Sequence, residues 1–290
     1  MKLCRFGEDR LGLVEDNMVR DVSAALDVIP SQRWPIAIGD PLITNFDAVL
    51  EKIKQIAGAA EALPLDEVQL QCPVTNPSKI MAAPANYRKH VEIDVKDPGL
   101  DHGFHAKTLE GVERPVEKFG LFLKSNSSVI GPSESIKRIL PDRRTDYEAE
   151  LTVIIGKTCR SVSRDEAMDY IAGYTVGLDM SVRGTEDRSF RKSLDTYSVF
   201  GPWIVTADEI PDPAALEIWL EKNGEPQQRS SVGAMTVDIP DLIAFASAHY
   251  TLHPGDLIMT GTPEGVGPVV AGDVIKVGCS GIGQMTIPVI

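Results

Sequence analysis

Two glutamates separated by a single residue, Glu148 and Glu150, are the side chains of this sequence best suited to hold a metal ion. In a β-strand, residues two apart point to the same face, so both carboxylates would share one side of the strand. Two like charges held together are costly unless a cation or a proton lies between them, and oxygen-only ligands suit Mg²⁺, Mn²⁺ or Ca²⁺. The alternative is a solvated polar face on a half-buried strand, which is the usual setting of a Glu-x-Glu pair.

A third carboxylate, Asp179, follows after one helix-length connection. Ser163 begins a Ser-x-x-Glu capping box, which predicts a helix that runs through Ala172 and ends at Gly173. The next strand is expected over residues 174–180. If this strand lies beside the strand of the glutamates, Asp179 can approach them and complete a site of three carboxylates.

Composition and charge limit the other classes of function. The chain has 290 residues, of which 43% are hydrophobic and 24% charged, as in an ordinary globular protein. A formal net charge of −13 repels phosphate backbones and anionic lipid surfaces, so we expect neither nucleic-acid nor membrane partners. The four cysteines are far apart, form no Cys-x-x-Cys pair and predict reduced thiols. The start of the chain does not resemble a signal peptide, and no apolar run approaches a membrane span, so we expect a cytoplasmic protein.

Apolar periodicity indicates how the chain is organised. Short strands are expected over residues 2–6, 11–14 and 18–22, and the apolar spacing over residues 44–62 predicts an amphipathic helix. Proline-containing segments then suggest a boundary near residue 75. We therefore expect a small β-containing N-terminal domain over 1–75 and a mixed α/β, strand-rich domain over 76–290. The polar segment 94–118 is long for a connection, and such segments often bind ligands.

An ordered series of motifs in the second domain resembles the fumarylacetoacetate hydrolase superfamily, over roughly residues 77 to 288. The motifs are Asn86-Tyr87-x-x-His90, Phe122-Leu123-Lys124-Ser125, Asp146-Tyr147-Glu148-Ala149-Glu150-Leu151-x-Val153-Ile154-Ile155-Gly156-Lys157, Gly173-Tyr174-Thr175, Asp179-x-Ser181-x-Arg183, Lys192-Ser193-x-Asp195-Thr196, Gly201-Pro202-Trp203 and Pro254-Gly255-Asp256-x-Ile258-x-Thr260-Gly261-Thr262-Pro263-x-Gly265-Val266-Gly267.

This resemblance implies a β-roll fold preceded by a small domain, and assembly as a homodimer. It also implies that Glu148, Glu150 and Asp179 bind Mg²⁺ or Mn²⁺, with Ca²⁺ in some members of the family. Members act on small oxo acids, including intermediates of aromatic compound catabolism, through reactions that share an enolate. A divalent ion chelated by a 2-oxo carboxylate lowers the energy of the charge that develops in such a reaction.

The same resemblance suggests roles for five further side chains. Lys192 matches the active-site lysine of the family. Arg183 matches a position near substrate, where a guanidinium suits a carboxylate, although a salt bridge to a nearby acid would explain it equally well. Thr262 could offer a hydroxyl and a backbone N–H to a substrate carboxylate, and Tyr87 and Lys124 are expected to contact substrate.

Hydrolysis also needs a base that activates water. His90 lies where the family places its catalytic histidine, and imidazole has a pKa near the working pH. Many relatives have His-x-x-Glu, but here Ile93 occupies the position of the glutamate. Glu92, Asp94 or Glu264 could orient His90 instead, and we rank Glu92 first.

Three functions therefore compete. The first is a metal-dependent hydrolase that cleaves a C–C bond of an acylpyruvate or a related 1,3-dicarbonyl acid. The second is a decarboxylase of the oxaloacetate type, or an isomerase of 2-hydroxy-dienedioates, which needs the metal and Lys192 but no activated water. The third is a non-catalytic oxo-acid-binding protein.

Overall fold

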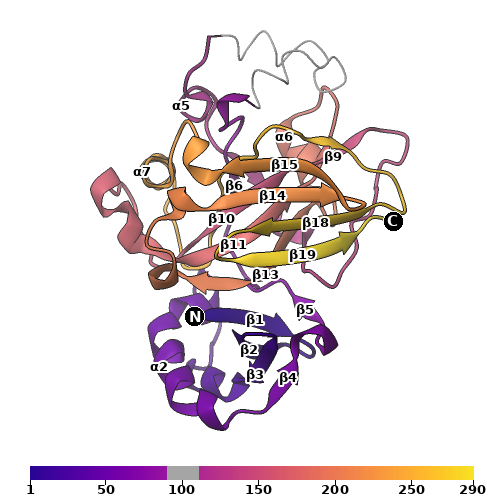
Figure 1. Ribbon diagram of the computed structural model, residues 1–290. Helices are drawn as coiled ribbons and strands as arrows, with labels where there is room; N and C mark the ends of the chain where they lie inside the picture. Colours follow the sequence, from indigo (N-terminus) through magenta and orange to yellow (C-terminus); the bar gives the residue numbers. More distant parts are fainter. Residues whose placement is uncertain (90–110) are drawn as a thin grey trace.

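The computed structural model describes residues 1–89 and 111–290, and they form three β-sheets (Figure 1). The largest sheet has 12 strands among the described residues. Ten of them follow one another in the order β4 (Ala62–Pro64), β3 (Met18–Asp21), β2 (Arg10–Glu15), β1 (Lys2–Phe6), β13 (Ser198–Thr206), β11 (Ile171–Asp179), β10 (Ala149–Ile155), β16 (Leu257–Met259), β6 (Ile80–Ala82) and β7 (Phe122–Lys124). Two short strands lie off this path, with β5 (Leu70–Gln71) beside β1 and β8 (Val129–Ile130) beside β13.

The two smaller sheets cover and extend the large one. The four-stranded sheet has the order β15 (Glu225–Ser231), β14 (Glu217–Lys222), β18 (Val274–Cys279) and β19 (Gly283–Pro288). Figure 1 shows it packed as a layer in front of β10, β11 and β13. The three-stranded sheet consists of β12 (Ser181–Val182), β9 (Thr145–Tyr147) and β17 (Gly267–Pro268).

Helical segments are short. The α-helices of the described residues are α1 (Pro41–Thr44), α2 (Phe46–Ile56), α5 (Pro115–Phe119), α6 (Arg188–Lys192) and α7 (Ile239–His249). The 3-10 helices span Ser23–Val28, Ala57–Ala59, Leu65–Glu67, Asn126–Ser128, Arg164–Tyr170, Ala207–Glu209, Pro213–Ala215 and Val232–Ala234.

Both faces of the central strands are buried, which explains why their sequences are apolar throughout. Every residue of β10, β11 and β13 is buried. Alternate residues of β10 enter different cores: Val153 packs in the cluster that contains Leu220 of the four-stranded sheet, whereas Ile154 packs in the cluster that contains Ile53 of α2. A strand covered on both faces reads as a continuous hydrophobic run. The polar residues within these strands are therefore exceptions that need a reason.

The N-terminal strands and the mixed α/β, strand-rich character agree with the expectations from sequence, and two helices do not. The helix expected over 44–62 divides into α1, α2 and a 3-10 turn, and the chain enters β4 at Ala62. The capping box at Ser163 is present, with its hydroxyl donating to Glu166 Oε2 at 2.6 Å. However, the helix it opens is a 3-10 helix that ends at Tyr170, and β11 begins at Ile171. The prediction of a helix through Ala172 was wrong because this segment joins the central sheet early.

The N-terminal strands and the rest of the chain share the large sheet. Lys2 and Leu3 of β1 pair antiparallel with Val205 and Ile204 of β13. Figure 1 shows the β1–β4 unit and α2 below the other strands, joined to them along this edge. The division near residue 75 stays a prediction, since a continuous sheet can either join two folding units or belong to one.

Candidate active site

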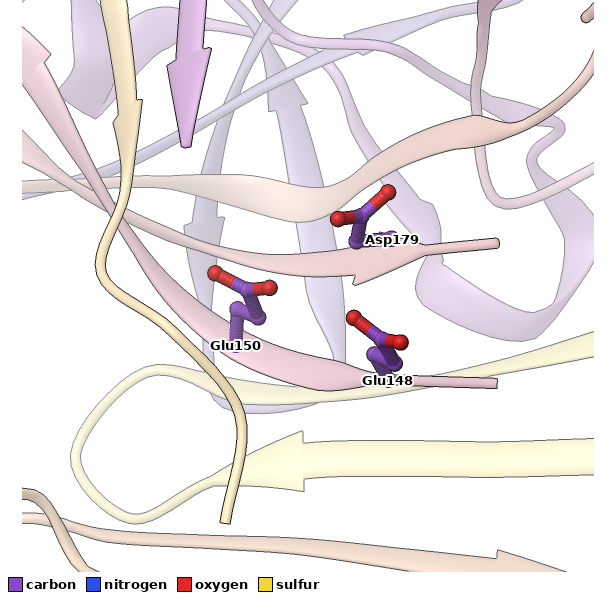
Figure 2. Close-up of side chains that lie close together, drawn as sticks. All are labelled: Glu148, Glu150 and Asp179. Carbon is purple, nitrogen blue, oxygen red and sulfur yellow. The ribbon is translucent and has the colours of Figure 1, made fainter. Parts of the chain in front are cut away.

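Three carboxylates meet where β10 and β11 lie side by side (Figure 2). Glu148 occupies the break between β9 and β10, Glu150 lies in β10, and Asp179 ends β11. Glu150 is paired with Gly177, and the N–H of Asp179 donates to the carbonyl of Glu148 at 2.9 Å. One oxygen from each carboxylate lies within 4.8 Å of the others. The two strands are neighbours, which is the condition on which the three-carboxylate site depended, and the acids converge.

The acids are buried, so the alternative of a solvated polar face is excluded. Glu148, Glu150 and Asp179 are 6%, 2% and 0% exposed. Burial, followed by the neighbouring charges of Asp179 and Glu148, raises the pKa of Glu150 well above its usual value. The backbone N–H of Gly261 donates to Glu150 Oε2 at 2.6 Å and offsets part of that cost. Three buried oxygen donors at this spacing fit a hard divalent cation such as Mg²⁺ or Mn²⁺.

Lys192, at the end of α6, contacts two of the three acids. Its Nζ donates to Glu148 Oε2, Asp179 Oδ2 and Ser181 Oγ, each at 2.6 Å. Burial alone would lower the pKa of Lys192, but the carboxylates of Asp179 and Glu148 outweigh it and raise the pKa. This lysine is therefore held as a buried ammonium at the acidic cluster, and its role in catalysis stays a prediction.

Lys124, at the end of β7, approaches Asp179 through its other oxygen. Its Nζ donates to Asp179 Oδ1, to the carbonyl of Lys192 and, at 3.0 Å, to the carbonyl of Tyr197. Burial is the main cause of a lowered pKa for Lys124. An ammonium has three donors, and these three contacts use them all. Contact of Lys124 with substrate, as expected from the sequence, stays a prediction.

Arg183 forms ion pairs, as one of its two interpretations required. Its Nε donates to Asp146 Oδ2 at 2.9 Å and its Nη2 to Glu148 Oε1 at 3.1 Å. Arg144 donates to the other oxygen of Asp146 at 2.8 Å. The guanidinium of Arg183 thus binds the Glu148 oxygen that Lys192 does not contact, and a contact of Arg183 with substrate remains a prediction.

Thr262 lies in the loop that follows β16. This loop reaches the acids through the Gly261 N–H, and Gly261 has a φ of +101°, which a side chain would strain. The Thr262 hydroxyl is buried and accepts a hydrogen bond from Gln228 Nε2 at 2.9 Å. The structure therefore brings the Thr262 loop to the acidic cluster.

Tyr87 has a buried hydroxyl that finds no hydrogen-bond partner in the described parts of the chain. The side chain is 1% exposed. Burial, with a smaller contribution from Glu150, raises the pKa of the phenol. An unpaired buried donor is uncommon and fits the predicted contact with a ligand.

His90 and two of its candidate partners, Glu92 and Asp94, lie outside the described residues. The third candidate partner, Glu264, has its Oε1 3.8 Å from Nζ of Lys89.

Two buried amides near the site were not singled out from the sequence. Gln228 of β15 bonds to the strand of the glutamates and to the Thr262 loop. Asn86 donates to the carbonyls of Val237 and Thr260, both at 2.8 Å. Asn86 was part of a motif, but nothing marked Gln228, because a glutamine on a polar strand normally points to solvent.

Residues 79–290 match the family model described as "Fumarylacetoacetate (FAA) hydrolase C-terminal". The chain belongs to the fumarylacetoacetate hydrolase family. It is 46% identical over 289 residues to the maleylpyruvate hydrolase of Aquipseudomonas alcaligenes, covering 100% of this chain and 99% of that one. The recognition of the family, the sheet-rich mixed α/β fold and the assignment as an enzyme of this hydrolase family are confirmed.

Solved structures agree. The maleylpyruvate hydrolase of Sphingobium sp. SYK-6, in complex with manganese(II) and pyruvate, has 39% identity and a TM-score of 0.82, covering 100% of this chain and 99% of that one. A 5-carboxymethyl-2-hydroxymuconate delta-isomerase from Mycobacterium smegmatis has 30% identity and a TM-score of 0.73, with 100% and 99% covered. Within the described part of this chain, no helix combines the length and apolar character needed to cross a membrane.

Proposed function

We propose that this protein hydrolyses a C–C bond of an acylpyruvate, and that maleylpyruvate is the first substrate to test. Water adds to the acyl carbonyl, the bond to the pyruvate carbon breaks, and the products are a carboxylic acid and pyruvate. The observation that carries this proposal is the buried cluster of Glu148, Glu150 and Asp179 with Lys192 Nζ at 2.6 Å from two of the acids. The full-length similarity to a maleylpyruvate hydrolase supports the choice of substrate.

The three acids would hold Mn²⁺ or Mg²⁺. When bound, such an ion acts as a Lewis acid toward the oxygens of a 2-oxo carboxylate. The solved relative that holds manganese and pyruvate supports Mn²⁺ as the ion to try first. The buried position of the acids excludes bulk water, which strengthens every charge interaction within the cluster.

The side chains of the protein divide the remaining tasks. Lys192 places a positive charge beside the acids, where it stabilises the negative charge that develops on the pyruvate half. The Thr262 hydroxyl donates a hydrogen bond to the substrate carboxylate. The Tyr87 hydroxyl, which has no partner among the described residues, donates to a second substrate oxygen. The base assigned from sequence is His90, which takes a proton from water, with Glu92 orienting the imidazole.

The experiment that tests this proposal uses chelator-treated protein with and without added Mn²⁺ or Mg²⁺. Maleylpyruvate, a neutral acylpyruvate and oxaloacetate are supplied in separate reactions, and the products are identified by mass. Metal-dependent release of pyruvate with the matching carboxylic acid is expected. In ¹⁸O-labelled water, the carboxylic acid product should gain one label. The cleavage step should add no label to pyruvate.

An alternative rests on the similarity to the delta-isomerase at 30% identity. Isomerisation or decarboxylation uses the same charge stabilisation but no activated water. This alternative predicts that His90→Ala keeps substantial turnover. Hydrolysis predicts that His90→Ala loses turnover but still binds the metal. Carbon dioxide and pyruvate from oxaloacetate, with acylpyruvates left intact, would replace the hydrolase proposal with a decarboxylase. We further propose a homodimer, which light scattering on the purified protein tests.

A further inference from the structure

Gln228 connects the strand of the glutamates to the Thr262 loop. Its side chain is 2% exposed although β15 is mostly exposed. The Oε1 atom accepts from the N–H of Ala149 at 3.0 Å, and Nε2 donates to Thr262 Oγ1 and to the carbonyl of Pro263, both at 2.9 Å. All three contacts of this amide therefore go to the strand of the glutamates and to the loop whose Gly261 N–H binds Glu150.

The position of Ala149 gives the first contact its importance. Ala149 lies between the two glutamates, where the chain passes from the three-stranded sheet to the large sheet. Gln228 Oε1 binds the Ala149 N–H at this junction. The Thr262 loop is tied to the same strand through Gly261 N–H and Glu150 Oε2 at 2.6 Å. Gln228 thus adds a side-chain connection between the glutamate strand and the loop to those made by Thr260 and Gly261.

The orientation of the amide follows from its partners. The Ala149 N–H can only donate, and the Pro263 carbonyl can only accept, so exchanging Oε1 and Nε2 would place donor against donor and acceptor against acceptor. Nε2 must therefore be the donor to Thr262 Oγ1. A hydroxyl that accepts from an amide keeps its own proton for another acceptor.

We propose that Gln228 is a positioning residue that fixes the Thr262 hydroxyl as a hydrogen-bond donor to the carboxylate of the 2-oxo acid. The inference rests on the proposed function, because it takes pyruvate, the expected product, as the ligand. Gln228 does not touch the ligand in this scheme. It acts by occupying the acceptor side of the hydroxyl, which leaves the hydroxyl proton for the ligand.

A double-mutant cycle with Gln228→Glu and Thr262→Val tests this inference. Glutamate has nearly the same shape and keeps an acceptor for Ala149, but it would draw the Thr262 proton toward itself. The dissociation constant for pyruvate is measured by titration of Mn²⁺-loaded protein, together with kcat and KM. Each single variant should weaken pyruvate binding by about 10- to 100-fold, the range for a hydrogen bond to a charged group. In the Thr262→Val background, Gln228→Glu should add less than about twofold, because the hydroxyl it controls is gone.

Controls separate positioning from folding. Gln227→Glu places the same charge on the outer side of β15 and keeps the acceptor of the Tyr147 hydroxyl, so its pyruvate affinity should match that of the unaltered protein. Thr262→Ser keeps a hydroxyl and should restore most of the affinity lost in Thr262→Val. Melting temperature and Mn²⁺ affinity are recorded for each variant. If Gln228→Glu does not fold, Gln228→Met replaces it, since it removes the donor without adding charge.

Equal losses from the Gln228 substitution in both backgrounds would overturn the inference, as would unchanged pyruvate affinity in Gln228→Glu or Gln228→Met. Failure of pyruvate to bind the unaltered, Mn²⁺-loaded protein would also overturn it. The proposed function fails separately, when the unaltered protein binds pyruvate but hydrolyses no acylpyruvate, and the cycle then still decides the role of Gln228.

Discussion

Asp179 has a lysine at each carboxylate oxygen: Lys192 Nζ is 2.6 Å from Oδ2, and Lys124 Nζ contacts Oδ1. Both lysines are buried, so the pairs are little screened by solvent. Glu150, by contrast, receives a backbone N–H from Gly261 and no lysine in the contacts of the described residues. The acids are therefore unequal, and Glu150 is the one whose charge depends most on a bound cation.

Lys192→Met should lower kcat by about 100-fold or more, because an ammonium aimed at developing charge contributes on that scale. Mn²⁺ affinity should be unchanged or higher, since Lys192 competes with a divalent ion for Glu148 Oε2 and Asp179 Oδ2. Steady-state kinetics and titration of Mn²⁺ by electron paramagnetic resonance measure the two effects. Lys157→Met, at an exposed position just after β10, is the matched control. Weaker Mn²⁺ binding in Lys192→Met would contradict this account of the lysine.

Glu150→Gln should weaken Mn²⁺ binding by about 100-fold or more, because a charged ligand is lost. In chelator-treated protein the same substitution should keep or raise the melting temperature. Burial and Asp179 raise the pKa of Glu150 above its usual 4.5, so the protonated carboxyl group contributes to the stability of the fold. This contribution is lost as pH rises through the folded-state pKa.

Calorimetry of chelator-treated protein between acid and neutral pH checks the sign. The stability of the unaltered protein should fall with rising pH more than that of Glu150→Gln. Glu225→Gln, on the exposed surface of β15, should behave like the unaltered protein. A lower melting temperature for chelator-treated Glu150→Gln would show that Glu150 is stabilising without a metal.

Asn86→Ala should destabilise the fold by about 3 kcal/mol, because buried groups left without a partner cost about 1–3 kcal/mol each. Asn86 donates to the carbonyls of Val237 and Thr260 and accepts from Thr236 Oγ1 and the Val237 N–H. Asn86→Asp keeps the acceptor and loses the donors, so this variant should also have a measurably lower free energy of unfolding. Chemical denaturation measures both variants. A change below about 0.5 kcal/mol would mean that water replaces the lost contacts.

The four cysteines should resist thiol reagents in the native protein at pH 8 and should all react after denaturation. All four are buried, and burial raises the pKa of Cys4 and Cys72 to about 12 from a usual 9.0. Their contribution to stability is complete below pH 9 and declines as pH rises toward 12, because the unfolded chain loses thiol protons first. Counting reactive thiols with a chromogenic disulfide tests the first statement. Rapid native labelling of any cysteine would contradict it.

The carboxylate cluster could be predicted because its signal is local. Period-two spacing places Glu148 and Glu150 together, and the family motif marks Asp179 and Lys192. The ion pairs of Arg183 were only one of two interpretations. The partner Asp146 is 37 positions away in the sequence, and the local sequence does not show which strands pair.

Residues that act through long-range contacts could not be found in this way. Gln228 lies on a strand that reads as exposed, and only the packing of two sheets turns it inward. The helix expected after Ser163 begins where it was predicted but ends earlier. Local capping residues mark where a helix starts, but they carry no information on the pairing of the following residues with a central sheet. The acid that orients His90 stays a prediction from sequence, because His90 lies outside the described residues.

β10 and β11 carry two of the three acids at the middle of the large sheet, with neighbours on both sides and cores on both faces. Local opening is cheapest at edges and loop tips and most costly at such central strands. The amide hydrogens of Glu150 and Gly177 should therefore exchange only when the whole protein unfolds. Ligand exchange must then occur while β10 and β11 stay paired, and a substitution that lowers global stability will separate these strands only in proportion to the unfolded population.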